Sequence, residues 1–204
     1  MKRPDRFQIL GTLVLVAVLF DITVNISKYG SVLDALWFCN VTAFILAAGL
    51  FRKDPRLLTM TLVLAVPGQF MWIADFFLEM FGHGLGRTAE LWGYGPVVFF
   101  SSVTLHGLLI PCSFYGVWKK GFDPKALVPA LIYVYILLTV TFLLTPPAEN
   151  VNCVFFRCDG EDPGTGYWRH FIIGSLLVWS VVVPVVFQAL RWFFGRFSPA
   201  ERTA

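Results

Sequence analysis

Six long blocks of apolar residues constrain the fold of this chain more than any other feature of its sequence. Each block is close to the roughly 20 residues that a helix needs to cross a hydrocarbon core about 30 Å thick. The blocks are continuously apolar, without the alternation typical of outer-membrane β-strands. We therefore predict an all-α, polytopic membrane helix bundle, built as one domain over residues 1–204, with six transmembrane helices at 7–26, 33–51, 57–80, 97–118, 126–145 and 171–194.

The composition agrees with this class of protein. The chain is 57% hydrophobic and 14% charged, whereas soluble domains are roughly 45–50% apolar and 25% charged. The first block follows basic residues, as the core of a secretory signal does. No small-residue cleavage motif comes after it, and Asp21 and Asn25 continue it at helical spacing. We therefore interpret this block as a transmembrane helix.

The distribution of basic residues predicts the orientation. With a cytoplasmic N-terminus, the outward-facing segments hold only Lys28, Arg87, Arg157 and Arg169 out of sixteen Lys and Arg. Short basic loops stay inside, so both termini are expected to be cytoplasmic. This asymmetry also accounts for the net charge of +3, so nucleic acid is not indicated as a partner. We expect an integral, multipass protein of a bacterial inner membrane, although other membranes fit the orientation equally well.

Polar residues within the blocks gather on one side of the membrane. An ionisable group inside a span costs roughly 2.5–3.5 kcal/mol on insertion scales and marks a candidate functional site. The predicted inner halves carry nothing stronger than threonine. The outer halves hold Asp21, Asn25, Asp34, Cys39, Asn40, Gln69, Asp75, Glu79, Ser101, Ser102, Thr104 and His106. This gradient predicts a polar cavity that opens outwards, although acidic residues near block ends are also compatible with simple solvation at the interface.

Cys39 and His106 are the candidate catalytic residues of this cavity. A rise of 1.5 Å per residue places them about 10 and 13 Å below the outer surface, so a Cys–His pair is geometrically feasible. Such a pair produces a thiolate nucleophile, with Asn40, Gln69 and Asp75 as candidate substrate-binding residues. The alternative is that the cysteine and the histidine only pack in the core.

The remaining histidines and cysteines suggest structural roles. His83, His106 and His170 lack the spacing of a zinc motif, and a single histidine within a span cannot ligate a haem on both sides. We therefore expect no metal and no cofactor. Cys153 and Cys158, in "CVFFRC", are a candidate disulfide if the outer side is oxidising. The sequence leaves their pairing open.

Three short motifs together resemble the YwaF-like family of polytopic membrane proteins. They are "WFCN" with Cys39, "TLHGLL" with His106, and "ENVNCVF" with Asn150 and Asn152. The chain departs from the family at Trp37 and Phe38, where a histidine or glutamine commonly precedes the cysteine. It also resembles uncharacterised bacterial multipass membrane proteins that share segments of this type.

The resemblance to the YwaF-like family implies a phospholipid acyltransferase, the activity attributed to its eukaryotic members. It implies that His106 deprotonates Cys39 and that Cys39 takes an acyl chain as a thioester. Asn40 or Asn152 would then donate hydrogen bonds to the oxyanion, with Asn150 also substrate-binding, and membrane lipids would be the partners.

Two other classes of function stay open. One is a small transporter or channel whose acidic outer vestibule attracts cations. The other is a non-catalytic assembly subunit whose outer loop, 146–170, binds a membrane-protein partner or a second copy of the chain.

Overall fold

The computed structural model describes residues 4–83, 87–157 and 162–197, and it contains helices and no strand within these ranges. Five helices are long and apolar enough to cross a membrane: Arg6–Lys28, Pro55–Met80, Pro96–Lys120, Pro124–Leu144 and Tyr167–Phe197. The expected all-helical membrane bundle is therefore confirmed at this level. The predicted span at 33–51 is represented by a shorter apolar helix, Phe38–Arg52.

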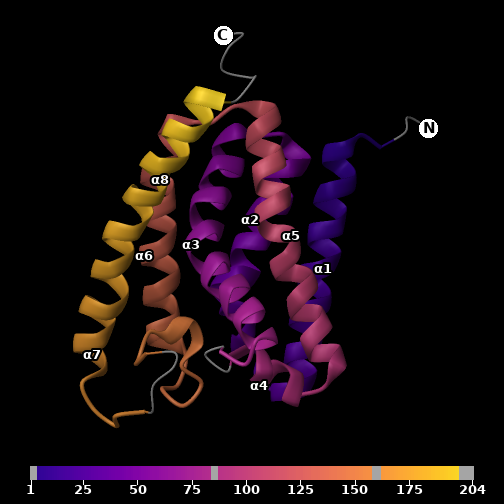
Figure 1. The fold of residues 1–204 in the computed structure, drawn as a ribbon. Helices are drawn as coiled ribbons and strands as arrows, with labels where there is room; N and C mark the ends of the chain where they lie inside the picture. Colours follow the sequence, from indigo (N-terminus) through magenta and orange to yellow (C-terminus); the bar gives the residue numbers. More distant parts are fainter. Residues whose placement is uncertain (1–3, 84–86, 158–161, 198–204) are drawn as a thin grey trace.

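The chain runs up and down through the bundle (Figure 1). The longer helices are α1 (Arg6–Tyr29), α2 (Phe38–Arg52), α3 (Pro55–Met80), α5 (Pro96–Lys120), α6 (Leu127–Leu144) and α8 (Val178–Phe197). Shorter elements are η1 (Val32–Leu36), α4 (Arg87–Gly93), η2 (Pro124–Ala126), η3 (Val151–Cys153), α7 (Tyr167–Arg169) and the π-helical η4 (His170–Leu177). The helices α7, η4 and α8 follow one another without a break.

The bundle has two different ends. We call the end where α1 begins and α8 finishes the terminal end, and the opposite end, with the long connections, the loop end (Figure 1). The helices α1, α2, α3 and α5 pack against one another, while α6 and α8 lie on the far side of α3. The beginning of α1 and the end of α8 share one end, as the predicted topology requires. The cytoplasmic location of that end stays a prediction.

The surface of the bundle is apolar, as expected for contact with lipid. Large hydrophobic side chains are exposed on every long helix, among them Leu13, Phe70, Phe100, Ile136 and Val185. Exposed apolar area on this scale is rare in soluble monomers. The core beneath it is built from residues such as Leu46, Leu62 and Leu105, none of which is more than 1% exposed.

The helices α2, α3 and α5 approach closely near the terminal end. A Cβ added at Gly116 of α5 would lie 2.7 Å from Leu58 Cδ2 of α3, and one added at Gly49 of α2 would lie 3.0 Å from Leu57 Cβ. In the same region Phe51 lies over Gly11 of α1. Small residues allow close approach of membrane helices, so these glycines set the packing at the terminal end.

The predicted helix 33–51 is broken at Trp37, whose φ and ψ of −54° and 135° are not helical. The cause is a set of side-chain hydrogen bonds that replace the helical ones. Asn152 donates to the Leu36 carbonyl at 2.8 Å and accepts from the Phe38 amide at 2.6 Å, while Asn40 donates to the Asp34 carbonyl at 3.2 Å. The segment is therefore a short 3₁₀ helix followed by α2, rather than one continuous span.

Candidate functional site

The buried polar side chains divide between the two ends as the sequence gradient predicts. In the terminal half, Thr61 and Ser113 donate to carbonyls of their own helices, at 3.0 and 2.6 Å. In the loop half, carboxyl and amide groups are buried instead: Asp21, Asn40, Gln69 and Asp75 are each no more than 4% exposed. The groups that demand a partner are thus found in the loop half.

Asp21 on α1 is a buried carboxyl group with only one of its two oxygens hydrogen-bonded. Its Oδ2 accepts a hydrogen bond from Asn25 Nδ2 at 3.0 Å, one helical turn further along. Its Oδ1 is buried and has no hydrogen-bond partner. The nearby Ser101 hydroxyl on α5 donates to the Val98 carbonyl at 2.9 Å. Asp21 Oδ1 therefore accepts no hydrogen bond in this arrangement, although the Ser101 hydroxyl is close enough to interact with the Asp21 carboxyl group.

Asp34 lies close enough to Asp21 for the two carboxyl groups to repel each other. It sits in η1, just before α2, and its Oδ2 is also buried without a hydrogen-bond partner. Burial raises the pKa of Asp34, Trp37 opposes this by hydrogen bonding, and the charge of Glu149 raises it further. Two carboxyl groups with an unpaired oxygen each thus share this part of the loop half.

Asn40 on α2 contacts the backbone of Asp34 and is 1% exposed. Its Nδ2 is used by the Asp34 carbonyl, and its Oδ1 has only the Cys39 sulfur at 4.0 Å as a neighbour of hydrogen-bonding type. A thiol at this distance is a weak donor. The Asn40 Oδ1 atom is therefore a third oxygen in this region with spare capacity to accept or to coordinate.

The structure does not bring Cys39 and His106 into contact. Cys39 has a free thiol, is partly buried in the first turn of α2, and has Asp21 and Tyr133 as electrostatic neighbours. None of the contacts among the described residues joins it to His106. The expected pair therefore receives no support from this arrangement.

His106 on α5 faces α3 instead. Its Nδ1 is hydrogen-bonded to Gln69 Oε1, and its ring stacks on Trp72 with centroids 4.4 Å apart and planes 12° apart. Gln69 and Trp72 are three residues apart on α3, hence on one face of that helix. Because the amide oxygen can only accept, Nδ1 carries the proton and Nε2 is the ring nitrogen able to accept one.

Asp75, predicted to bind substrate, is used to attach α4. Its Oδ2 accepts from the Thr88 amide at 3.0 Å and from the Thr88 hydroxyl at 3.2 Å. The helix α4 lies in the glycine-rich connection 81–96, between the predicted spans 57–80 and 97–118. The carboxyl of Asp75 thus holds this connection against the loop end of α3.

Asn150 and Asn152 are used by the backbone of the loop that follows α6. Both have positive φ, 40° and 55°, a region that asparagine tolerates better than most residues. Asn150 Oδ1 accepts from the Phe155 and Phe156 amides at 3.1 and 3.3 Å. Asn152, besides its bonds to Leu36 and Phe38, donates to Thr141 Oγ1 at 3.1 Å. It therefore links η1, α2 and α6.

Cys153 is disulfide-bonded, and Cys158, its predicted partner, lies outside the described residues. The carbonyl of Cys153 is hydrogen-bonded to His170 Nε2 at 3.0 Å. Within residues 4–83, 87–157 and 162–197, no group of three or more His, Cys, Asp and Glu side chains is placed to hold a metal ion.

Sequence reasoning missed three features of this region. It did not anticipate the Trp72–His106 stack, the role of Thr88, or the hydrogen bond between Thr42 Oγ1 and Tyr133 OH at 3.1 Å. A usable signal existed for the first, since Gln69 and Trp72 share a helix face. The second and third connect residues on different helices and leave no local pattern.

Fold and surface together define a multipass, helical integral membrane protein. No protein-family model, no curated protein and no solved structure matches this chain. Its function must therefore be inferred from its own residues.

Proposed function

We propose that this protein is a small membrane transporter of a monovalent cation, Na⁺ or H⁺, and that it binds one such cation between Asp21 and Asp34. The observation that carries the proposal is the pair of buried carboxyl oxygens, Asp21 Oδ1 and Asp34 Oδ2, that have no hydrogen-bond partner. An unpaired carboxylate in a poorly solvated site is costly. A bound cation or proton removes that cost and also the repulsion between the two groups.

The donor atoms favour a hard monovalent ion. Asp21 Oδ1, Asp34 Oδ2 and Asn40 Oδ1 are all oxygens, which suit hard cations rather than soft metals. Only two of these three groups are carboxyls, fewer than multivalent sites usually assemble. Asp34 in η1 lies at the loop end, so the ion enters from that side.

Transport requires the terminal half to open, because that half is closed by apolar packing in the described structure. Leu46, Leu50 and Leu62 are no more than 1% exposed there. The helices α3 and α5 each contain an internal proline, Pro67 and Pro111. A proline removes a helical hydrogen bond and is a common site of bending. Pro67 is followed by Gly68 and then Gln69, so a bend there also moves the partner of His106.

The binding part of the proposal is tested by thermal unfolding of purified protein in NaCl and in choline chloride at equal ionic strength, across a pH series. An ion that binds only the folded state raises the melting temperature in proportion to ln(1 + [ion]/Kd). We expect a rise with Na⁺, or a rise on acidification if H⁺ is the ligand. Asp21→Asn should abolish the response and Glu79→Gln, an acidic control on α3, should keep it.

Two results would overturn the proposal. A wild-type melting temperature indifferent to both Na⁺ and pH would exclude ion binding at Asp21. Binding without any uptake of ²²Na⁺ or of protons into proteoliposomes would exclude transport.

Acyl transfer at Cys39 is a second candidate, favoured by two observations. Asn152 fixes the first turn of α2, which places the Cys39 thiol at the N-terminal end of that helix. Gln69 holds His106 with Nε2 able to accept a proton. If α5 brings Nε2 to the thiol, His106 takes its proton and the sulfur attacks a lipid ester carbonyl. The lysolipid alcohol then leaves with that proton. A second lipid hydroxyl attacks the thioester carbonyl, the C–S bond breaks, and the hydroxyl proton passes through His106 to the Cys39 sulfur.

A labelling experiment separates this candidate from ion transport. Membranes containing the protein are incubated with an alkyne-tagged acyl lipid, and hydroxylamine-sensitive label is measured. The label should disappear in Cys39→Ala and persist in Cys112→Ala, since Cys112 also has a free thiol among the described residues. Equal labelling of wild type and Cys39→Ala would exclude a Cys39 thioester.

A further inference from the structure

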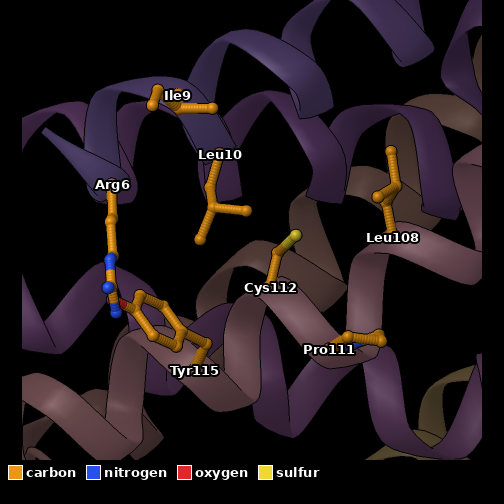
Figure 2. A pocket seen from close by; sticks show the side chains of 7 residues that line it. All are labelled: Arg6, Ile9, Leu10, Leu108, Pro111, Cys112 and Tyr115. Carbon is orange, nitrogen blue, oxygen red and sulfur yellow. The ribbon is translucent and has the colours of Figure 1, made fainter. Parts of the chain in front are cut away.

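A groove runs along the lipid-facing surface between α1 and α5, towards the terminal end (Figure 2). It has a volume of about 440 Å³, within the range of small-molecule sites. Its walls are Ile9 and Leu10 of α1 and Leu108, Pro111, Cys112 and Tyr115 of α5. Apart from Arg6, which also lines it, every one of these side chains is apolar or aromatic.

Arg6 marks one end of this groove. It is an exposed residue in the first turn of α1, and its side chain extends towards Tyr115 (Figure 2). Arg6 has no ion pair with any described residue, since the two surface ion pairs are Lys53–Asp5 and Arg56–Asp123. The apolar groove thus ends at a positive charge that has no ion-pair partner among the described residues.

The ammonium group of Lys120 is a second positive charge near the same end of the groove. The Lys120 Nζ atom lies 5.4 Å from the centre of the Phe7 ring, and that ring is 5.6 Å from the ring of Tyr115. Lys120 also lacks an acidic partner among the described residues. Asp5, the acidic residue nearest in sequence to Arg6, is taken by Lys53. The mouth of the groove therefore keeps a net positive charge.

We propose that this groove binds an anionic diacyl phospholipid from the leaflet at the terminal end. One acyl chain lies along Ile9, Leu10, Leu108 and Pro111, and the phosphate contacts Arg6 and Lys120. The positive charges of Arg6 and Lys120 favour an anionic phospholipid as the occupant of the groove. A membrane already supplies hydrocarbon chains to any apolar groove, but only an anionic headgroup neutralises the two unpaired cations. The inference is independent of the ion site at Asp21.

Native mass spectrometry of the delipidated, detergent-solubilised protein tests the proposal. Phosphatidylglycerol and phosphatidylcholine with identical acyl chains are titrated separately. We expect phosphatidylglycerol to bind more tightly, and Arg6→Gln to weaken its binding about fivefold, the factor that corresponds to about 1 kcal/mol per basic residue. Lys120→Gln should weaken it similarly, and neither change should alter phosphatidylcholine binding.

Two further variants separate the headgroup from the chain. Arg191→Gln removes an exposed basic residue of the same end on α8, away from the groove, and should leave both lipids unaffected. Ile9→Trp fills the groove at a position already 47% exposed, and should weaken both lipids alike. Equal binding of the two lipids to wild type would overturn the proposal. So would competition by glycerol 3-phosphate as effective as that of the whole lipid, since the groove would then not be needed.

Discussion

The terminal half and the loop half of the bundle are stabilised by different interactions. Near the terminal end, glycines at positions 11, 49 and 116 let Phe51, Leu57 and Leu58 pack directly against neighbouring helices. Near the loop end, amide and carboxyl side chains connect segments that are far apart in sequence. The terminal half is stabilised by close packing of side chains against glycines, and the loop half is stabilised by hydrogen bonds from side chains to other segments. Mutations should therefore act through different costs in the two halves.

Overpacking the terminal half should have the largest effect. In Gly116→Leu, the new side chain has no space beside Leu58, and the folded state should lose about 3 kcal/mol. Gly107→Leu is the matched control on the same helix, because a Cβ at Gly107 meets nothing within 4 Å. Thermal unfolding in detergent, followed by circular dichroism, compares them. Equal melting temperatures for both variants would show that close packing at Gly116 does not stabilise this half.

Removing a polar connection from the loop half should cost somewhat less. Asn152→Ala leaves the Phe38 amide and the Leu36 carbonyl without their partner, which costs about 2 kcal/mol when such groups stay buried. Asn152→Gly relieves the positive φ but also lacks the amide, so it should be destabilised too. A wild-type melting temperature in Asn152→Gly would mean that this residue matters only through its backbone conformation.

Neutralising Asp34 should have the opposite sign. Because burial raises its pKa in the folded state above the ordinary value of 3.8, folding favours the protonated form. The stability of the wild type should therefore fall as the pH rises from 3.8 through the raised pKa. Without Na⁺, Asp34→Asn should be more stable than wild type at pH 7, and this part of its pH dependence should be flat. A less stable Asp34→Asn protein at pH 7 would contradict the assignment.

The smallest effect is expected at the surface of the terminal end. The hydrogen bond from Lys53 is the main reason that the pKa of Asp5 is lowered below 3.8. A lowered pKa stabilises the folded state above pH 3.8, and this contribution is lost as the pH falls through the folded value. Asp5→Asn keeps a good helix N-cap but loses the ion pair. Its melting temperature should be slightly below wild type at pH 6, and this difference should shrink as the pH falls below 3.8.

The helices were predictable because their apolar blocks are a local property of the sequence. Five predicted spans correspond closely to long helices, whereas the helix predicted at 33–51 is interrupted. The interruption depends on Asn152, which is more than a hundred residues away along the chain. Its partner therefore could not be found from the pattern around Trp37.

For the candidate site, residue counting predicts a depth for each side chain but not its direction around the helix axis. Counting residues placed Cys39 and His106 at similar levels, yet it could not tell which way each side chain points around its helix axis. His106 faces Gln69 and Trp72 on α3, and Cys39 lies near Asp21. Two side chains at the same depth come into contact only if their helices are neighbours and both side chains point towards each other.

The short connection between α2 and α3 bears on how the chain enters the membrane. With 15 residues, α2 is about 22 Å long, less than the hydrocarbon core of about 30 Å. Only Lys53, with a φ of 53°, and Asp54, which caps α3, separate the two helices. A segment too short to insert by itself can be inserted as one arm of a helical hairpin. We therefore expect α2 to insert into the bilayer only after α3 has been synthesised, so that the two helices insert together.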